Sequence, residues 1–123
     1  MSQFAGQDYV SLETYRKTGV AVATPIWFAE SGSGVFYAYS EAAAGKVKRI
    51  RNNPEVRIAP CTMRGLVTGE WVKARARIVD DAAEITRGQQ LLSRKYPLKR
   101  LFDLFRRFSA KPRALIEIRL SRS

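Results

Sequence analysis

The stretch AGKVKRIRNNPEVRIAPCTMRG, residues 44–65, joins a basic helical segment to a strand. Four cations of this stretch fall within six positions: Lys46, Lys48, Arg49 and Arg51. Pro54 disfavours helical geometry at the residue before it, so we expect the helix to end at about Asn52. The segment VRIAPCT, residues 56–62, then has the composition of a strand. This order predicts a short helix that packs on a sheet and carries an unusual concentration of positive charge.

The periodicity of an α-helix sorts the side chains of this segment into faces. The apolar stripe consists of Ala43, Val47 and Ile50. Lys46 and Arg49 lie along one edge of that stripe, and Lys48 and Arg51 lie along the other. Two cations three residues apart can bind one phosphate, and Ser40, the predicted cap of the helix, would add a hydroxyl donor. A basic face that contacts only solvent is the equally weighted alternative.

The rest of the chain alternates short strand patterns with a few helical ones. Strands are expected at residues 9–19, 20–30, 35–40, 56–62, 71–80 and 113–121, and further helices at 81–96 and 98–110. The last helix is strongly amphipathic and basic, and we expect it to dock on its own domain or on a second subunit. Arg75 and Arg77 share one face of their strand, which is either a solvated face or the basic wall of a cleft. The pattern predicts a mostly β protein, an antiparallel barrel with peripheral helices, built as a single domain over residues 1–123.

Composition excludes several classes of chemistry. The chain contains no His and a single Cys, Cys61, so we expect no internal disulfide, no transition-metal site and no imidazole-based catalysis. The single Cys and the lack of a signal-peptide pattern favour the cytoplasm. The net charge of +11 favours anionic ligands. No aromatic residues interleave with the cations of the basic helix, so nucleic acid is not the expected partner, and membrane contact is the less favoured interpretation.

The segment TPIWF, residues 24–28, is the second candidate for a binding surface. Pro25 cannot donate a hydrogen bond to a neighbouring strand, so we expect an edge or a bulge there. Backbone groups near Thr24 would then be free for a ligand, and Trp27 lies on the same side of the strand as Pro25. A flat apolar surface beside free backbone groups suits a planar heterocycle, although a core position for Trp27 is the likelier interpretation when that residue is taken alone.

These segments occur in an order that resembles a known family. The family is the pyridoxamine-phosphate-oxidase class of oxidoreductases, within the flavin-binding split-barrel superfamily. Its members have segments similar to SLETYRKTG, TPIWF, AGKVKRIRNNPEVRIAPC, GEWVKARARIV and KYPL of this chain. The subgroup resembled depends on the deazaflavin coenzyme F-420. The resemblance implies a six-stranded antiparallel split β-barrel and a homodimer with cofactor sites at the subunit interface. It also implies hydride transfer from the reduced deazaflavin to a small organic acceptor of the enone or quinone type.

The resemblance further implies roles for particular residues. Lys46 and Arg49 would hold the cofactor phosphate with help from Ser40, and Thr24, Pro25 and Trp27 would line the ring system. Arg64 would meet the acidic tail of the coenzyme, and Lys95 and Tyr96 would approach from the partner subunit. No residue is assigned as catalytic. FMN in place of F-420, and a carrier that binds a flavin without turnover, are the alternatives.

Overall fold

The computed structural model describes residues 3–32, 34–96 and 113–121, and these residues form a closed six-stranded barrel with two helices. The elements are β1 (Tyr9–Tyr15), β2 (Ala21–Glu30), β3 (Val35–Glu41), α1 (Gly45–Asn52), β4 (Glu55–Cys61), β5 (Val72–Val79), α2 (Ala82–Lys95) and β6 (Arg113–Leu120). The strands follow one another around the barrel in the order β1-β2-β3-β6-β5-β4, and every neighbouring pair is antiparallel. The predicted fold class is therefore confirmed. The helix predicted at residues 98–110 lies outside the described residues.

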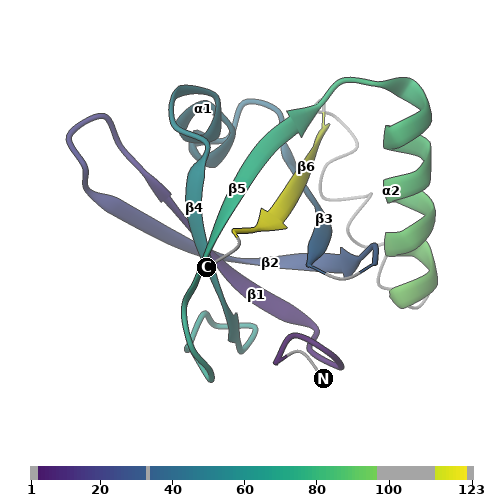
Figure 1. Cartoon of the computed structure of the whole chain (residues 1–123), viewed down its shortest axis with the longest axis horizontal. Coiled ribbons are helices and arrows are strands. Elements are labelled where there is room, and N and C mark those ends of the chain that lie inside the picture. Colours follow the sequence, from purple (N-terminus) through teal and green to yellow (C-terminus); the bar gives the residue numbers. More distant parts are fainter. Residues whose placement is uncertain (1–2, 33, 97–112, 122–123) are drawn as a thin grey trace.

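The interior of the barrel is filled by alternate residues of the strands. Its apolar cluster draws on every strand and includes Val10, Leu12, Phe28, Phe36, Ile58, Ala74, Ile116 and Ile118. Helix α1 covers one end of the barrel (Figure 1). Val47 and Ile50 of α1 are buried, as the apolar stripe predicts, and Ile50 belongs to the barrel cluster. Burying these two side chains contributes roughly 3–5 kcal/mol, so the apolar stripe fixes the orientation of the helix.

Helix α2 lies on the outside of the barrel, beside the end of β2 and far from the turn that joins β1 to β2 (Figure 1). A second apolar cluster joins it to the outer face of β2, β3 and β6 through Tyr37, Leu92 and Leu115. Gly88 allows the close approach, because a Cβ at this position would lie 2.6 Å from Cδ2 of Leu115. The helix begins with Asp81, whose side chain accepts a hydrogen bond from the backbone N–H of Glu84.

The start of α1 differs from the prediction. Ser40 does not cap the helix: it lies in β3, where it pairs with Ala114 of β6, and the cap position is Ala44, which makes no side-chain hydrogen bond. Pairing with β6 extends β3 through Glu41, so the strand ladder prevails over a favourable local cap. The predicted end at Asn52 is confirmed.

The barrel is split along one edge of β2. β2 pairs with β1 from Ala21 to Trp27, but it pairs with β3 only from Phe28 to Glu30. The first part of β2 therefore has a neighbour on one side only. Pro25 is in this part, which confirms the expected edge position, and α1 lies at the same end of the barrel.

Candidate functional site

The site begins with the cationic edge of α1. Lys46 and Arg49 are partly buried, whereas Lys48 and Arg51 on the other edge are exposed. The guanidinium Nε of Arg49 donates to Oγ1 of Thr14, a fully buried residue of β1, at 2.6 Å. A Cβ at Gly45 would lie 2.6 Å from Nη1 of Arg49, so the guanidinium folds back over the first turn of the helix. The structure thus fixes Arg49 beside the helix N-terminus, where backbone N–H groups favour anions.

Lys46 is the second cation of this edge, and the charges of Arg49 and Glu41 both act on it. Burial lowers the pKa of Lys46, and the positive charge of Arg49 lowers it further, while Glu41 acts in the opposite direction. A bound anion would offset both effects, because its negative charge would favour the protonated form of Lys46. The predicted pairing of Lys46 with Arg49 is consistent with this geometry, and α1 supplies both residues.

Thr24 lies on the inner face of β2, opposite Leu12 of β1. Its hydroxyl is buried and has no hydrogen-bond partner among the described residues. A buried hydroxyl left unpaired costs about 1–3 kcal/mol. Thr24 is therefore a candidate ligand-binding residue, since a ligand atom at this position would satisfy the hydroxyl.

The free edge of β2 adds backbone groups to the site. The backbone N–H of Arg16 donates to the carbonyl of Val20, which makes these two residues a hydrogen-bonded pair at the start of the ladder. Hydrogen-bonded pairs alternate with non-hydrogen-bonded ones in an antiparallel ladder. The next hydrogen-bonded pairs of β1 and β2 are therefore Thr14–Val22 and Leu12–Thr24. The backbone groups of Ala23 and Pro25 consequently point away from β1, toward the split in the barrel. They are available to polar atoms of a ligand.

Trp27 lies on the outer face of β2 with Pro25, so Thr24 does not share a face with these two residues. The ring of Tyr96 stacks on the indole at 4.5 Å between centroids and 11° between planes. Tyr96 is buried against the indole of its own chain, and the expectation that it approaches from a partner subunit stays a prediction. Tyr96 covers one face of Trp27, and the ring of Tyr9 lies 6.4 Å from the indole between centroids and 64° from it between planes, so two aromatic neighbours limit the part of the indole that a ligand can reach.

The two remaining predicted residues lie in different surroundings. Ser40 is buried and donates to the carbonyl of Glu41 at 3.2 Å, at the β3 end that leads to α1. Arg64 is exposed on the loop between β4 and β5. That loop passes close to β2, because a Cβ at Gly65 would lie 3.7 Å from Cδ of Pro25. Arg64 is thus near the Pro25 side of the site, and Lys46 and Arg49 are at the α1 side.

Two residues of the site were not predicted for the roles they have. Thr14 holds Arg49 in place, and Tyr96 holds Trp27 in place from within its own chain. Thr14 and Arg49 are 35 positions apart, and Tyr96 bonds to the backbone of Phe28 across 68 positions. The periodicity of a single segment does not predict contacts between residues so far apart in the sequence.

The described part of the chain contains neither a candidate metal site nor a helix that could span a membrane. Within it, no group of three or more His, Cys, Asp or Glu residues could hold a metal ion. None of the described helices has the length and apolar character needed to cross a bilayer.

The described residues thus form a split barrel in which a cationic helix edge lies beside a free strand edge. Residues 1–122 match the family described as pyridoxamine 5'-phosphate oxidase, and the chain belongs to this family. No curated protein matches the chain in sequence.

Solved structures with the same fold have distant sequences. The heme storage protein HutZ from Vibrio cholerae is 15% identical, with a TM-score of 0.69 over 96% of this chain and 84% of HutZ. A conserved hypothetical protein from Mycobacterium tuberculosis is 17% identical, with a TM-score of 0.70 over 99% of this chain and 82% of the other. An F420 reductase is 19% identical, with a TM-score of 0.54 over 93% of this chain and 86% of the other. At these identities the likeness establishes the fold alone.

Proposed function

We propose that this protein is an oxidoreductase that binds the deazaflavin coenzyme F-420 and reduces a small organic acceptor of the enone or quinone type. The observation that carries the proposal is the partly buried pair of Lys46 and Arg49, two neighbouring cations on one edge of α1 whose mutual repulsion and burial lower the pKa of Lys46. Membership of the pyridoxamine 5'-phosphate oxidase family supports a phosphorylated ligand, and the F420 reductase with the same fold supports a deazaflavin.

The residues of this chain would bind and orient the coenzyme. Lys46 would contribute a compact charge and Arg49 a planar fork of donors to the phosphate, with Arg49 held in place by Thr14. The hydroxyl of Thr24 and the free backbone groups of β2 would hydrogen-bond polar atoms of the ring system. The bound coenzyme would supply the hydride, and the protein would supply position and electrostatics.

We further propose that the site is completed in a homodimer. Met63 and Leu66 are exposed to 67% and 70%, and both lie on the β4–β5 loop that passes Pro25. Large apolar side chains that extend from a loop beside a binding site commonly pack against a partner. Leu66→Asp should shift the protein from dimer to monomer in light scattering and weaken cofactor binding. A variant that stays dimeric and binds normally would contradict this arrangement.

The experiment that tests the function is a titration of the purified protein with F-420 and, separately, with FMN. We expect F-420 to bind with defined stoichiometry and FMN to bind more weakly. Turnover of reduced F-420 with a panel of enones and quinones then tests the reaction. Tight FMN binding with no response to F-420 would refute the choice of cofactor, and failure of both to bind would refute the site.

The second candidate is a flavin-binding or carrier protein without turnover. It is favoured by one observation, that HutZ has the same fold and is a heme storage protein. This candidate predicts tight cofactor binding with no acceptor reduced by any member of the panel. A measurable rate with a single enone or quinone would exclude it.

A further inference from the structure

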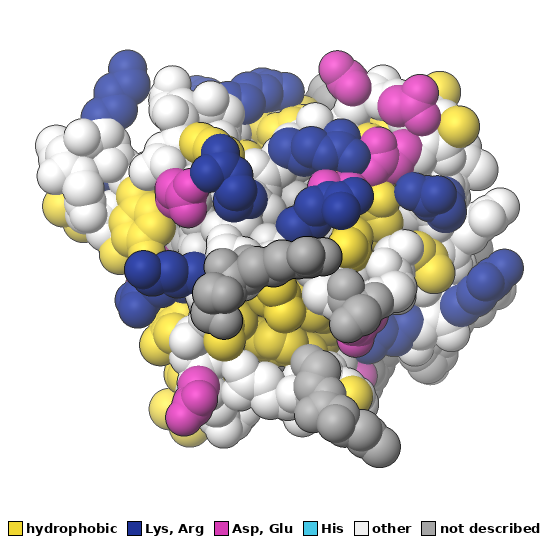
Figure 2. Space-filling view, in the orientation of Figure 1, with side chains coloured by type: hydrophobic (Ala, Val, Ile, Leu, Met, Phe, Trp, Pro, Cys, Tyr) yellow, Lys and Arg dark blue, Asp and Glu magenta, His cyan; other side chains and the backbone are white. Residues whose placement is uncertain are grey.

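A second basic surface lies on the outer face of β5 and β6. Arg75 and Arg77 of β5 are directly opposite Arg119 and Glu117 of β6, respectively. These positions alternate with Ala74, Ala76, Ile116 and Ile118, which point into the barrel. Figure 2 shows Lys and Arg side chains spread over one face of the molecule with hydrophobic side chains visible between them.

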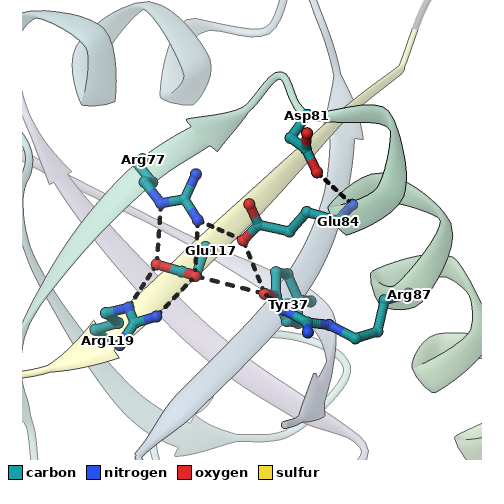
Figure 3. A network of polar contacts seen from close by, with 7 residues as sticks. All are labelled: Tyr37, Arg77, Asp81, Glu84, Arg87, Glu117 and Arg119. Carbon is teal, nitrogen blue, oxygen red and sulfur yellow. Dashed lines mark hydrogen bonds and ion pairs between the residues drawn. The ribbon is translucent and has the colours of Figure 1, made fainter.

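Glu117 organises the arginines of this surface (Figure 3). It is 2% exposed and accepts from Arg77 at 3.1 and 2.9 Å and from Arg119 at 2.8 and 3.4 Å. Burial raises the pKa of Glu117, but hydrogen bonds from Arg119 and Arg77 outweigh this effect and lower the pKa to about 2. Glu84 of α2 also accepts from Arg77, and Tyr37 donates to Glu84 at 2.9 Å. One buried carboxylate therefore holds two guanidinium groups in fixed orientations.

The arginines flank a groove. A hollow of about 650 Å³ is lined by Arg75, Arg77 and Arg119 together with Pro54, Ala76, Glu117, Leu120 and Ser121. A smaller hollow of about 340 Å³ shares Pro54, Ala76 and Arg77 with it and continues to Arg51 of α1. Cations thus recur along the groove beside two carboxylates, Glu117 and Asp80, and the remaining lining residues are small or apolar. Arg51 is on the edge of α1 opposite Lys46 and Arg49, so the groove is separate from the proposed cofactor site.

The cations of the groove retain unused donors. Arg75 and Arg119 are directly opposite each other across the two strands, an arrangement of like charges that is unfavourable unless an anion lies between them. Their side chains are 62% and 63% exposed, although each also pairs with a Glu. The contacts of Arg77 and Arg119 with Glu117 use Nε and Nη2, and Nη1 of both residues makes no hydrogen bond within the described structure.

We propose that this groove is a second binding site, for a small molecule that carries carboxylates or phosphates at intervals along a chain. Guanidinium groups held in fixed orientations bind such oxyanions in a bidentate manner, and the spacing of cations along the groove suits several anions on one chain. The described lining residues include no aromatic side chain, which disfavours stacked nucleic-acid bases.

Calorimetric titration of the full chain with inorganic tripolyphosphate and with a tetraglutamate peptide tests the proposal and separates the two sources of anion. We expect saturable binding of at least one of them that persists at about 150 mM salt, where exposed charges are largely screened beyond about 8 Å. Arg75→Gln combined with Arg119→Gln should weaken binding at least about ten-fold, a loss of about 1.4 kcal/mol. Lys17→Gln combined with Arg94→Gln removes the same charge from exposed positions outside the groove lining and should weaken binding less than about two-fold.

Two further variants keep the result interpretable. Ser121→Glu adds a carboxylate to the groove without removing a contact of Glu117, and it should reproduce the loss if the double variant does not fold. Lys46→Ala combined with Arg49→Ala removes the proposed phosphate site of α1, so the binding of either probe that remains in this variant is expected to belong to the groove. Equal losses in the groove and control variants, or loss only in the Lys46 and Arg49 variant, would overturn the groove proposal and leave the proposed function untouched.

Discussion

The hydroxyl of Tyr96 takes the place of a missing rung in the β1–β2 ladder. The ladder ends at Tyr9 and Trp27, so Asp8 and Phe28 would be the next hydrogen-bonded pair. Instead, the Tyr96 hydroxyl accepts from the backbone N–H of Phe28 at 2.9 Å. It lies 2.8 Å from the carbonyl of Asp8 and 2.9 Å from that of Phe28, so it can donate to either. The same side chain stacks on Trp27, and it therefore fixes the end of the strand on which Trp27 lies.

Tyr96→Phe should lower the free energy of unfolding by about 2 kcal/mol, because it keeps the stacked ring and leaves the buried N–H of Phe28 without a partner. For a domain of this size, that loss corresponds to a melting temperature lower by roughly 8 °C. Urea unfolding followed by tryptophan fluorescence measures the change, with an unchanged dependence on urea concentration as the sign that two-state behaviour is kept.

Tyr39→Phe is the matched control for this prediction. The hydroxyl of Tyr39 is buried and has no well-formed hydrogen bond within the described structure, so its removal should not lower the free energy of unfolding and is expected to leave it unchanged or raised. If Tyr96→Phe is as mild as Tyr39→Phe, the hydroxyl does not replace a ladder rung and the reasoning is wrong. A loss in Tyr96→Phe that is matched by a loss in Tyr39→Phe would also contradict it.

Three further predictions concern stability. Gly88→Ala should lower the free energy of unfolding by about 1–3 kcal/mol in urea, although Ala favours helix, because its Cβ would meet Leu115; a stabilised variant would contradict the packing of α2. Glu117→Gln should cost about 2 kcal/mol near pH 7. The wild type should lose this contribution as the pH falls from about 4.5 to 2, because the folded pKa of Glu117 is the lower one; a difference between the two proteins that is the same at pH 7 and pH 2 would count against it. Burial lowers the pKa of Lys95 to about 8, so the folded state binds fewer protons than the unfolded state and stability should rise between about pH 8 and 10.5. Lys95→Met should remove that rise, which thermal melts across this range would detect; an unchanged rise would assign it to another group.

Local pattern was sufficient for most of the barrel. Period-two alternation identified β5 and β6, and Pro54 correctly marked the end of α1. The helical periodicity also separated the two edges of α1, since Lys46 and Arg49 are partly buried and Lys48 and Arg51 are exposed. Each of these features depends on the residues of one segment, so the pattern of that segment is sufficient to predict it.

The contacts that define the site depend on the tertiary structure. Ser40 has a good capping side chain, but its pairing with Ala114, far along the chain, keeps it in β3. Gly88 appears from sequence only as a cost to the helix, whereas it permits contact with Leu115. Thr14 and Tyr96 likewise gain their roles from partners in other elements. Such roles follow from the barrel order and register, which single segments do not specify.

The most direct test of the central claim compares two double variants in their affinity for F-420. One variant combines Lys46→Ala with Arg49→Ala, and the other combines Lys48→Ala with Arg51→Ala. Each variant removes two positive charges from α1, so the change in the net charge of the protein is the same. We expect the first pair to raise the dissociation constant by about 100-fold, equivalent to two charge-assisted hydrogen bonds, and the second by less than about three-fold. Equal losses in the two folded variants would show that the Lys46 and Arg49 edge does not bind the cofactor phosphate.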